Sequence, residues 1–407
     1  MPARASFYAL IAFALLLGLF EGPAEIAAVV ALALLVASGG FKDARLNIAD
    51  IGMLVWLLAG TISLIHSPAK LGSEPNLRPL LALTYLLGRF AIAPADEAEL
   101  RRLALFFSAA CVINGLYGIF QVWVFDPPLE ALIVGRRHAQ HLVDPDAQDR
   151  LRMATGLFYN RVKLAHLGML GLGLLGLIAD AARRRQQPLW RPLGAALILG
   201  LAVFLSYRRA APVALLAAGL VLALLLRRLR LAVSVLAGVG LILALYGLTD
   251  YGRERMENTS LDVSERLEMV RAAVALILDH PLLGVGHGGY GPSIGPYLPP
   301  MASETLIRNA ITNPHNLSLQ ILAETGIVGF SGFAVAIAAS LAALTLAIRR
   351  DREVNSPQAT LDRFAFLGLV ALLGLGLVHA VLYQAPVGMA FWTLLGVASA
   401  RIESAGA

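Results

Sequence analysis

The stretch from residue 264 to residue 329 carries Ser264-Glu265-Arg266, Asp279-His280-Pro281-Leu282-Leu283-Gly284-Val285-Gly286, Asn313-Pro314-His315-Asn316 and Glu324-Thr325-Gly326. It is the one long polar interruption in an otherwise apolar chain. Pro281 and the glycines at 284, 286, 288 and 289 predict the end of a helix followed by turns, because glycine reaches backbone conformations that larger residues avoid. We expect the rest of the chain to be organised around this stretch.

A histidine in this stretch has the surroundings of a proton acceptor. Asn313 is a good helix N-cap and Pro314 suits the first helical position, so His315 is predicted to lie in the first turn of a new helix. The positive end of a helix dipole lowers the pKa of a nearby histidine. We therefore expect a neutral His315 imidazole, the form that accepts a proton.

Composition places the chain in a membrane. Of its 407 residues, 58% are hydrophobic and 15% are charged, and the mean hydropathy is +0.71. No soluble domain needs so much apolar surface, so the sequence predicts an all-α polytopic membrane protein with no nucleic-acid partner. The apolar run that follows Arg4 is interpreted as a membrane span, not a signal peptide, because another apolar run follows at once.

The apolar runs give the number of spans. They cover residues 7–20, 24–38, 48–65, 77–93, 103–125, 157–179, 192–207, 210–226, 231–249, 326–348, 364–383 and 386–400. If each run crosses the bilayer, the chain has about 12 transmembrane helices in a single membrane domain, residues 1–407.

The charges predict the orientation of these spans. With the N-terminus in the cytoplasm, seventeen of the 33 basic residues fall in short inside segments, as the positive-inside rule requires. Eleven of the others lie in or next to two outside segments, 126–163 and 250–313. The sequence therefore predicts outer loops at 126–156 and at 250–313, the second inserted before the last three spans.

Basic residues on the predicted outer side suggest an anionic ligand. They are Arg161 and Lys163 at a membrane boundary, the neighbours Arg208 and Arg209, and Arg266 and Arg271 in the large loop. Each alone could be a solvated charge or a lipid-headgroup contact. As a set they fit a lipid diphosphate, because the guanidinium fork bonds two phosphate oxygens at once. Adjacent helical residues point about 100° apart, so only one of Arg208 and Arg209 is expected to face the site.

A metal site is not expected. The spacing His138-x-x-His141-x-x-Asp144 suits a divalent ion, but the neighbouring Arg136 and Arg137 would repel one. We therefore expect no metal and no other cofactor, and arginines would stabilise a departing diphosphate themselves. The remaining histidines are interpreted as packing residues (His166 and His379) or as turn residues (His280 and His287).

These motifs resemble the signature region of the O-antigen ligase and polymerase superfamily. The shared features are the run that opens at Ser264, the His280-Pro281-Leu282-Leu283-Gly284-Val285-Gly286 turn, and His315-Asn316 followed by Glu324-Thr325-Gly326. The resemblance implies a bacterial inner-membrane protein with a GT-C-type fold and a helical periplasmic insertion. It also implies a metal-independent inverting transferase whose active site faces the periplasm, so the 126–156 and 250–313 loops would be periplasmic.

The resemblance also assigns roles to residues. His315 matches the histidine proposed as the base for the acceptor hydroxyl, and Arg266 matches the arginine that opens the signature. Ser206-Tyr207-Arg208-Arg209 matches an arginine near the outer end of a helix, with either arginine as the equivalent. Asn160-Arg161, with Lys163 as an extra charge, matches an element at the outer start of a middle span. Arg136 and Arg137 are further candidate contacts for the acceptor or the phosphates.

The function implied is glycan transfer from undecaprenyl diphosphate to lipid A–core in lipopolysaccharide biosynthesis. The donor would be undecaprenyl-diphosphate-linked O-antigen, and membrane lipids would surround the protein. An O-antigen polymerase would use the same chemistry with another glycan as acceptor. Protein O-oligosaccharyltransferases often carry an additional periplasmic C-terminal domain, and this chain ends soon after its last predicted span. An organic-anion transporter would also explain many spans and buried arginines. It would be favoured by inverted repeats and by broken helices at mid-membrane, and neither is evident in the sequence.

Overall fold

All the regular structure in the described part of the chain is helical. The computed structural model describes residues 2–42, 44–66, 78–123, 153–158, 160–249, 253, 259–300, 302–303, 306–307, 310 and 313–405. The longer helices are α1 (Pro2–Leu17), α2 (Glu21–Ala37), α3 (Ile48–His66), α5 (Glu97–Trp123), α8 (Arg161–Arg184), α9 (Trp190–Leu205), α10 (Ala210–Leu225), α11 (Leu229–Leu248), α13 (Thr259–Asp279), α16 (Leu317–Arg350), α17 (Pro357–Gly376) and α18 (Ala385–Ala405). Shorter pieces are η2 (Arg78–Leu83), α4 (Thr84–Leu87), η3 (Gly88–Ile92), η5 (Gly156–Phe158), α14 (Tyr290–Ile294), η6 (Gly295–Tyr297) and η7 (Val381–Tyr383).

Among the described residues, five helices are long and apolar enough to cross a membrane: α5, α8, α16, α17, and α18 as far as Glu403. Each of the twelve predicted apolar runs overlaps a described helix, and several of these helices are apolar but shorter. The prediction of an all-α, multi-pass membrane protein is therefore confirmed. The count of about twelve spans and the GT-C-type fold stay predictions.

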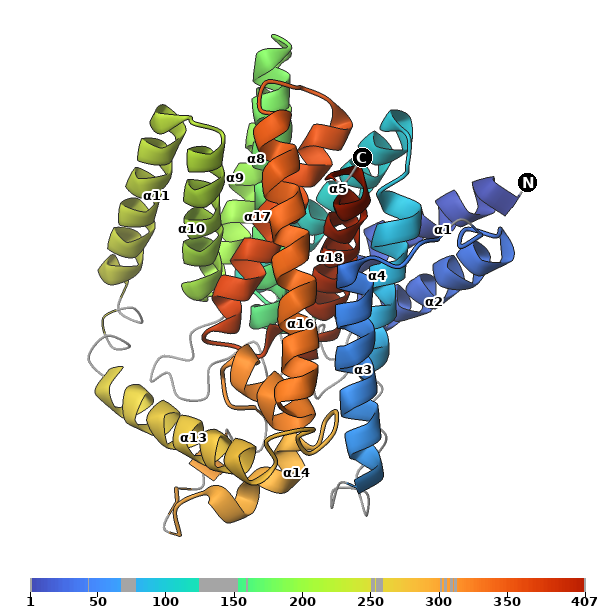
Figure 1. Cartoon of the computed structure of the whole chain (residues 1–407). Coiled ribbons are helices and arrows are strands. Elements are labelled where there is room, and N and C mark those ends of the chain that lie inside the picture. Colours follow the sequence, from blue (N-terminus) through green and yellow to red (C-terminus); the bar gives the residue numbers. More distant parts are fainter. Residues whose placement is uncertain are drawn as a thin grey trace.

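Helix α18 forms the centre of the bundle. Every residue from Ala385 to Ser399 is buried, and α16, α17 and the α4–η3 segment surround it (Figure 1). Gly396 faces the backbone of α4, so this pair of helices approaches more closely than a side chain would permit. Small residues at such contacts let two helix backbones approach closely. Van der Waals packing can then hold the helices together in a bilayer, where the hydrophobic effect does not act between them. The outer faces remain apolar, for example at Leu197, which is 75% exposed; a lipid surround explains such exposure.

Helix α16 breaks at one residue, and the break explains the signature glycines. Gly326 has φ 60° and ψ −169°, a conformation open essentially to glycine alone. The break frees backbone groups on both sides of it. The turn that follows α13 pairs with them: Val285 N–H donates to Ala323 O (2.9 Å), and Ile327 N–H donates to Pro281 O (2.9 Å). The two separated motifs therefore form one hydrogen-bonded unit.

The predicted turn glycines follow this geometry for the most part. Gly284, Gly286 and Gly288 have positive φ, as expected. Gly289 does not, since its φ is −76° and it precedes α14. The predicted turn is confirmed. The prediction that residue 289 needs a backbone conformation that larger residues avoid was wrong.

Gly326→Ala should destabilise the protein. An alanine Cβ would meet the backbone of Leu282, and the backbone strain alone costs about 1–3 kcal/mol. Gly374→Ala in α17 is the matched control, because a Cβ there meets nothing within 4 Å. The thermal midpoint of the detergent-purified protein should fall for the first variant and stay unchanged for the second. Equal midpoints would contradict this role of Gly326.

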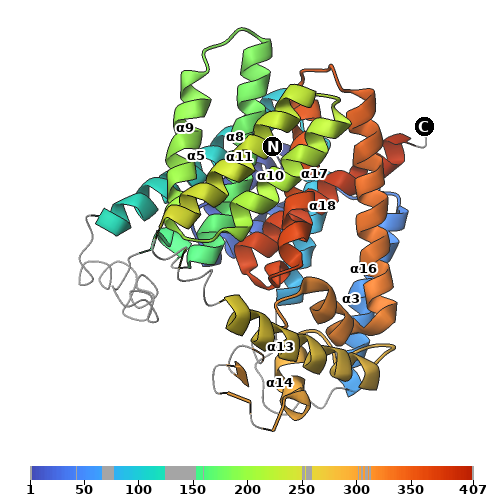
Figure 2. The same ribbon diagram turned by 90° about the vertical axis from the view of Figure 1, so that its left-hand side faces the viewer.

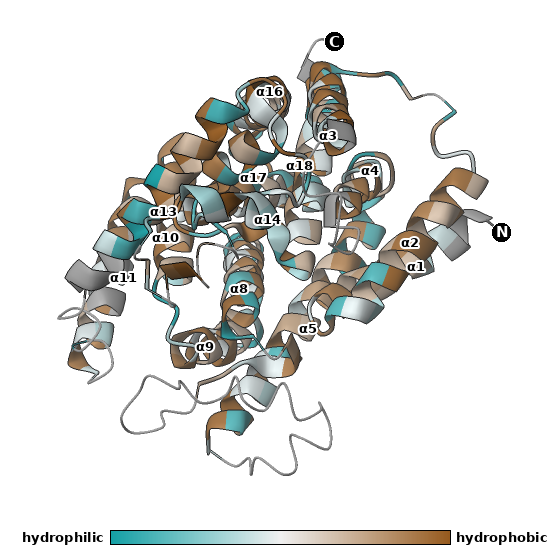
Figure 3. Ribbon diagram, turned by 90° about the horizontal axis from the view of Figure 1, so that it is seen from below, coloured by the Kyte–Doolittle hydropathy of each residue, from teal (hydrophilic) through white to brown (hydrophobic). Residues whose placement is uncertain are grey.

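Helices α13 and α14 lie across one end of the bundle (Figure 1, Figure 2). Their apolar side chains, such as Leu276, Tyr290 and Ile294, pack with Ala323 at the start of α16. Seen from this end, hydrophilic residues appear on α13 and on α8, whereas α2 is mostly hydrophobic (Figure 3). We call this the His315 end.

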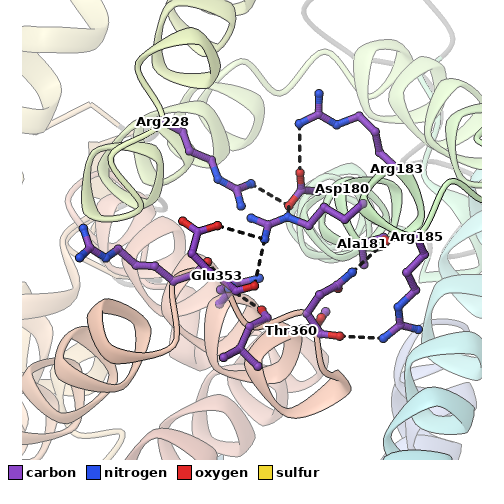
Figure 4. A network of polar contacts seen from close by, with 12 residues as sticks. Asp180, Ala181, Arg183, Arg185, Arg228, Glu353 and Thr360 are labelled. Atoms are coloured by element: carbon purple, nitrogen blue, oxygen red, sulfur yellow. Dashed lines mark hydrogen bonds and ion pairs between the residues drawn. The ribbon is translucent and has the colours of Figure 1, made fainter.

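The opposite end, which we call the Asp180 end, holds a network of ion pairs and hydrogen bonds (Figure 4). Asp180 at the end of α8 binds Arg228 at 2.7 Å and Arg184 at 3.2 Å. Arg363 donates to three carbonyls that follow α16, those of Asp351, Arg352 and Val354. These arginines join the ends of α8, α10 and α16, so structural contacts account for their charges.

Candidate functional site

His315 precedes the helix in which it was expected to lie. Helix α16 begins at Leu317, and its N-cap is Asn316, whose side chain accepts from Leu319 N–H at 3.0 Å. Asn313 instead accepts from His315 N–H at 2.9 Å. His315 itself has a left-handed φ of 50°. The prediction of Asn313 as N-cap was wrong, because a second asparagine three residues later takes that position in extended conformation.

Three histidine rings form a row at this end. The His315 and His379 rings lie 6.1 Å apart between centroids, and the His379 and His166 rings lie 5.8 Å apart. His379 follows α17, whereas His166 is 1% exposed within α8. The interpretation of His166 and His379 as simple packing residues overlooked that they adjoin His315. The predicted topology held a signal for it, since His379 falls near the outer end of its predicted span and His166 falls in the outer half of its own.

Arg208 lies beside this row. Ser206-Tyr207-Arg208-Arg209 forms the turn between α9 and α10, with Tyr207 in left-handed conformation. Arg208 is close enough to act electrostatically on all three histidines. Arg209 is not among the charges that act on His166 or His315. Of the two arginines that the sequence left open, Arg208 is therefore the one that faces the histidines.

Arg266 reaches the same place from α13. It is exposed, and its positive charge acts on both His315 and His379. Within the described part of the chain, no carboxylate pairs with it. Arg271, one and a half turns further along α13, instead forms an ion pair with Glu268 at 2.6 Å. The structure therefore brings together Arg208, Arg266 and His315, which the sequence placed in separate segments.

The surroundings of His315 keep its ring neutral. Burial lowers the pKa of His315 below its ordinary value, and the charges of Arg266 and then Arg208 lower it further. Its Nδ1 atom is buried without a hydrogen-bond partner among the described residues. The expected neutral imidazole thus stands, but its cause is burial and two arginines instead of the helix dipole. Burial also lowers the pKa of His379, to about 3.

The basic pair on α8 has contacts of its own. Asn160 is the N-cap of α8 and accepts from Val162 N–H at 2.8 Å, so the predicted helix start is confirmed. Lys163 forms an ion pair with Glu21 of α2, and the Arg161 guanidinium contacts Met153. A ligand phosphate would have to compete with Glu21 for Lys163. Arg136, Arg137 and the metal-like run from His138 to Asp144 lie outside the described residues.

A buried carboxylate holds the site segments in place. Glu324 is 1% exposed and accepts hydrogen bonds from the Tyr383 hydroxyl, from Gln320 and from the backbone of Gly288 and Tyr290. These contacts tie α16 to η7 and to the loop before α14. Sequence reasoning assigned Glu324 no role beyond its place in the signature. Its position beside a helix break explains why a carboxylate is needed there.

His287 has the structural role that was expected. Its ring packs edge-on against Trp56 of α3 at 4.8 Å, and a Cβ on Gly60 would collide with it. Burial lowers the pKa of His287 to about 4, although a hydrogen bond to the Leu57 carbonyl opposes the change. This histidine therefore fastens the loop at 284–289 to α3.

These features define a multi-pass α-helical membrane protein whose His315 end joins a neutral histidine to two arginines. Residues 194–334 match the family model for O-antigen ligase. The matched segment contains Arg208, Arg266, His315 and Glu324, and the match confirms the resemblance to this family. The match supports an O-antigen ligase or polymerase type of function in polysaccharide assembly. No curated protein sequence matches the chain.

Proposed function

We propose that this protein is an O-antigen ligase that transfers polysaccharide from undecaprenyl diphosphate to lipid A–core. The observation that carries the proposal is that Arg208 and Arg266, from different segments, both lie close enough to His315 to act on it electrostatically. A neutral base beside two fixed positive charges suits a reaction that removes a proton from a hydroxyl and releases an anion. The family match to residues 194–334 supports the same class of reaction.

The chemistry follows from these three residues. The acceptor hydroxyl oxygen attacks the anomeric carbon of the donor sugar, and its proton passes to the His315 imidazole. The bond between the anomeric carbon and the diphosphate oxygen breaks, so the configuration at that carbon inverts. Arg208 and Arg266 stabilise the charge that develops on the leaving diphosphate. Arginines thus supply the positive charge needed at the leaving group.

The other basic residues would extend the binding surface. Arg161 and Lys163 are proposed to approach the diphosphate from α8, Lys163 after release from Glu21. Arg209 is proposed as a contact at the rim, next to Arg208. Arg136 and Arg137 are proposed to contact the phosphates or the acceptor. Membrane lipids would surround the apolar faces.

The His315 end is proposed to face the periplasm of a bacterial inner membrane. The arginines of the Asp180 end fit the cytoplasmic side under the positive-inside rule. The loops at 126–156 and 250–313 would then be periplasmic. Reporter fusions after residues 184 and 252 should give cytoplasmic and periplasmic signals, respectively. A cytoplasmic signal after residue 252 would overturn this orientation.

The pH dependence of transfer should report the charge of Arg266. His315 is active when neutral, so kcat/KM should fall as the pH drops through its lowered pKa. Arg266→Ala removes one of the charges that lower this pKa, so the acid limb should move to higher pH. Arg271→Ala, on the same helix, should leave the limb in place. An acid limb that does not move in Arg266→Ala would show that another group titrates.

A strain that lacks the protein tests the proposed function. If the protein is the ligase, lipid-linked polysaccharide should accumulate while the lipid A–core stays bare. Core that carries a single repeat would instead identify a polymerase. Unchanged lipopolysaccharide, with a defect in protein glycosylation or in anion uptake, would reject both.

A further inference from the structure

We propose that His166, His379 and Gln384 form a subsite for the hydroxyl groups of the sugar attached directly to the donor diphosphate. The proposal rests on the proposed function, since it presumes a glycan carried on a lipid diphosphate. The three residues come from α8, from the segment after α17 and from the residue before α18.

Polar atoms in this place lack protein partners. His166 Nδ1 and Gln384 Oε1 are both buried, and neither has a hydrogen-bond partner among the described residues. The Gln384 side chain lies close enough to His166 to act on it as a hydrogen-bond partner, but the two side chains do not reach ordinary hydrogen-bond geometry. His315 Nδ1 is a third buried atom without a partner among the described residues. Buried polar groups are nearly always satisfied. A group of them beside the proposed base therefore indicates that a ligand supplies the missing bonds.

The segment that carries these atoms is held firmly. His379 N–H donates to Leu375 O at 2.9 Å, and the Gln384 carbonyl accepts from Gly388 N–H at 2.8 Å. Between them, the Tyr383 hydroxyl bonds to Glu324. A fixed backbone on both sides means that the side chains are oriented before a ligand arrives, which is what selective binding needs.

The chemistry of the subsite favours a neutral ligand with hydroxyl groups. Burial lowers the pKa of His379 to about 3, so its ring carries no charge at neutral pH. Neutral imidazoles and an amide both donate and accept hydrogen bonds, as sugar hydroxyls require. Arg208 lies close to all three histidines and would repel a metal cation. With Arg208 on the diphosphate, the group that reaches the histidines is the first sugar.

Binding of lipid ligands to the full-length protein in detergent tests this subsite without requiring transfer. The probes are undecaprenyl diphosphate itself and a set of forms that carry one hexose or one N-acetylhexosamine. The wild-type protein should bind at least one sugar-bearing form about 10-fold more tightly than the bare lipid, since each added hydrogen bond contributes modestly. Deoxy analogues of that sugar should lose this gain.

Two variants test whether the subsite causes the tighter binding of the sugar-bearing lipid. Gln384→Ala and His166→Phe should bring the affinity for the sugar-bearing form close to that for the bare lipid, whose own binding stays unchanged. Gln358→Ala and His287→Phe are the matched controls, because Gln358 Nε2 and His287 Nε2 are also buried and without partners among the described residues. Should His166→Phe fail to fold, Gln384→Ala carries the test, because Gln384 is only half-buried.

The outcomes separate the subsite from the proposed function. Equal affinity of the wild-type protein for bare lipid and all sugar-bearing forms would overturn the subsite and leave the ligase proposal standing. A loss of bare-lipid binding in Gln384→Ala would also overturn it, since these residues would then hold the diphosphate. Binding of no lipid diphosphate at all would remove the proposed donor and the subsite with it.

Discussion

Replacement of His315 by alanine should lower glycan transfer by about 10²–10⁴-fold, the usual contribution of a general base. The protein should still fold and bind undecaprenyl diphosphate, because the arginines remain. His315 has a left-handed backbone, a conformation that asparagine tolerates better than alanine does. His315→Asn should therefore show the same loss of transfer with less strain. His280→Ala, at the same end of the bundle, is the control and should stay active.

The structural alternative for His315 predicts different data. If the ring only fixes the chain before α16, His315→Ala should lower the thermal midpoint and leave turnover per folded molecule nearly unchanged. The thermal midpoints of His315→Ala and His315→Asn should then differ, and that of His315→Asn should be closer to the wild type. Such a result would remove the base from the mechanism.

Loss of Arg208 or of Arg266 should weaken donor binding and transfer together. Both charges would contact the phosphates in the ground state and in the transition state, and one charged hydrogen bond corresponds to about 10–100-fold. The chain offers a matched control for each. Arg209→Ala changes the neighbour of Arg208 in the same turn, and Arg271→Ala changes an arginine that α13 already pairs with Glu268.

Comparing each arginine variant with its control shows whether one particular arginine holds the diphosphate. We expect Arg208→Ala to be at least 10-fold worse than Arg209→Ala in the affinity for undecaprenyl diphosphate. We expect the same order for Arg266→Ala against Arg271→Ala. Equal losses within a pair would mean that general positive potential attracts the lipid and that no particular arginine holds the diphosphate.

The helical, multi-pass class could be predicted because hydropathy is a local property of the sequence. Each apolar run overlaps a helix that the structure describes, and the polar cap at Asn160 marks the start of α8. The predicted site residues could be named because basic residues on the outer side break a strong rule. Their assembly into one place could not, since it depends on how α9, α13 and α16 pack.

The details that sequence reasoning missed depend on long-range contacts. Asn313 and Asn316 are both good caps, and only the path of the chain selects the second. The pairing of the 281–286 turn with the break at Gly326 joins residues some forty positions apart. Sequence reasoning interpreted His379 as a packing residue and assigned Gln384 no role. In the fold, His379 lies beside His166 and His315, and Gln384 lies beside His166.

Arginines at the two ends of the bundle have different neighbours. At the Asp180 end, carboxylates and carbonyls occupy Arg184, Arg228 and Arg363. At the His315 end, the charges of Arg208 and Arg266 act on His315 and His379. This position beside the proposed base is why Arg208 and Arg266 are assigned to a ligand.

Transfer by the purified protein tests the central proposal most directly. The wild-type protein, reconstituted in lipid with undecaprenyl-diphosphate-linked O-antigen and lipid A–core, should produce core that carries the glycan, and His315→Asn should not. Release of undecaprenyl diphosphate should match the glycan transferred. Longer lipid-linked glycan with bare core, or equal transfer by His315→Asn, would contradict the proposal of a ligase with His315 as its base.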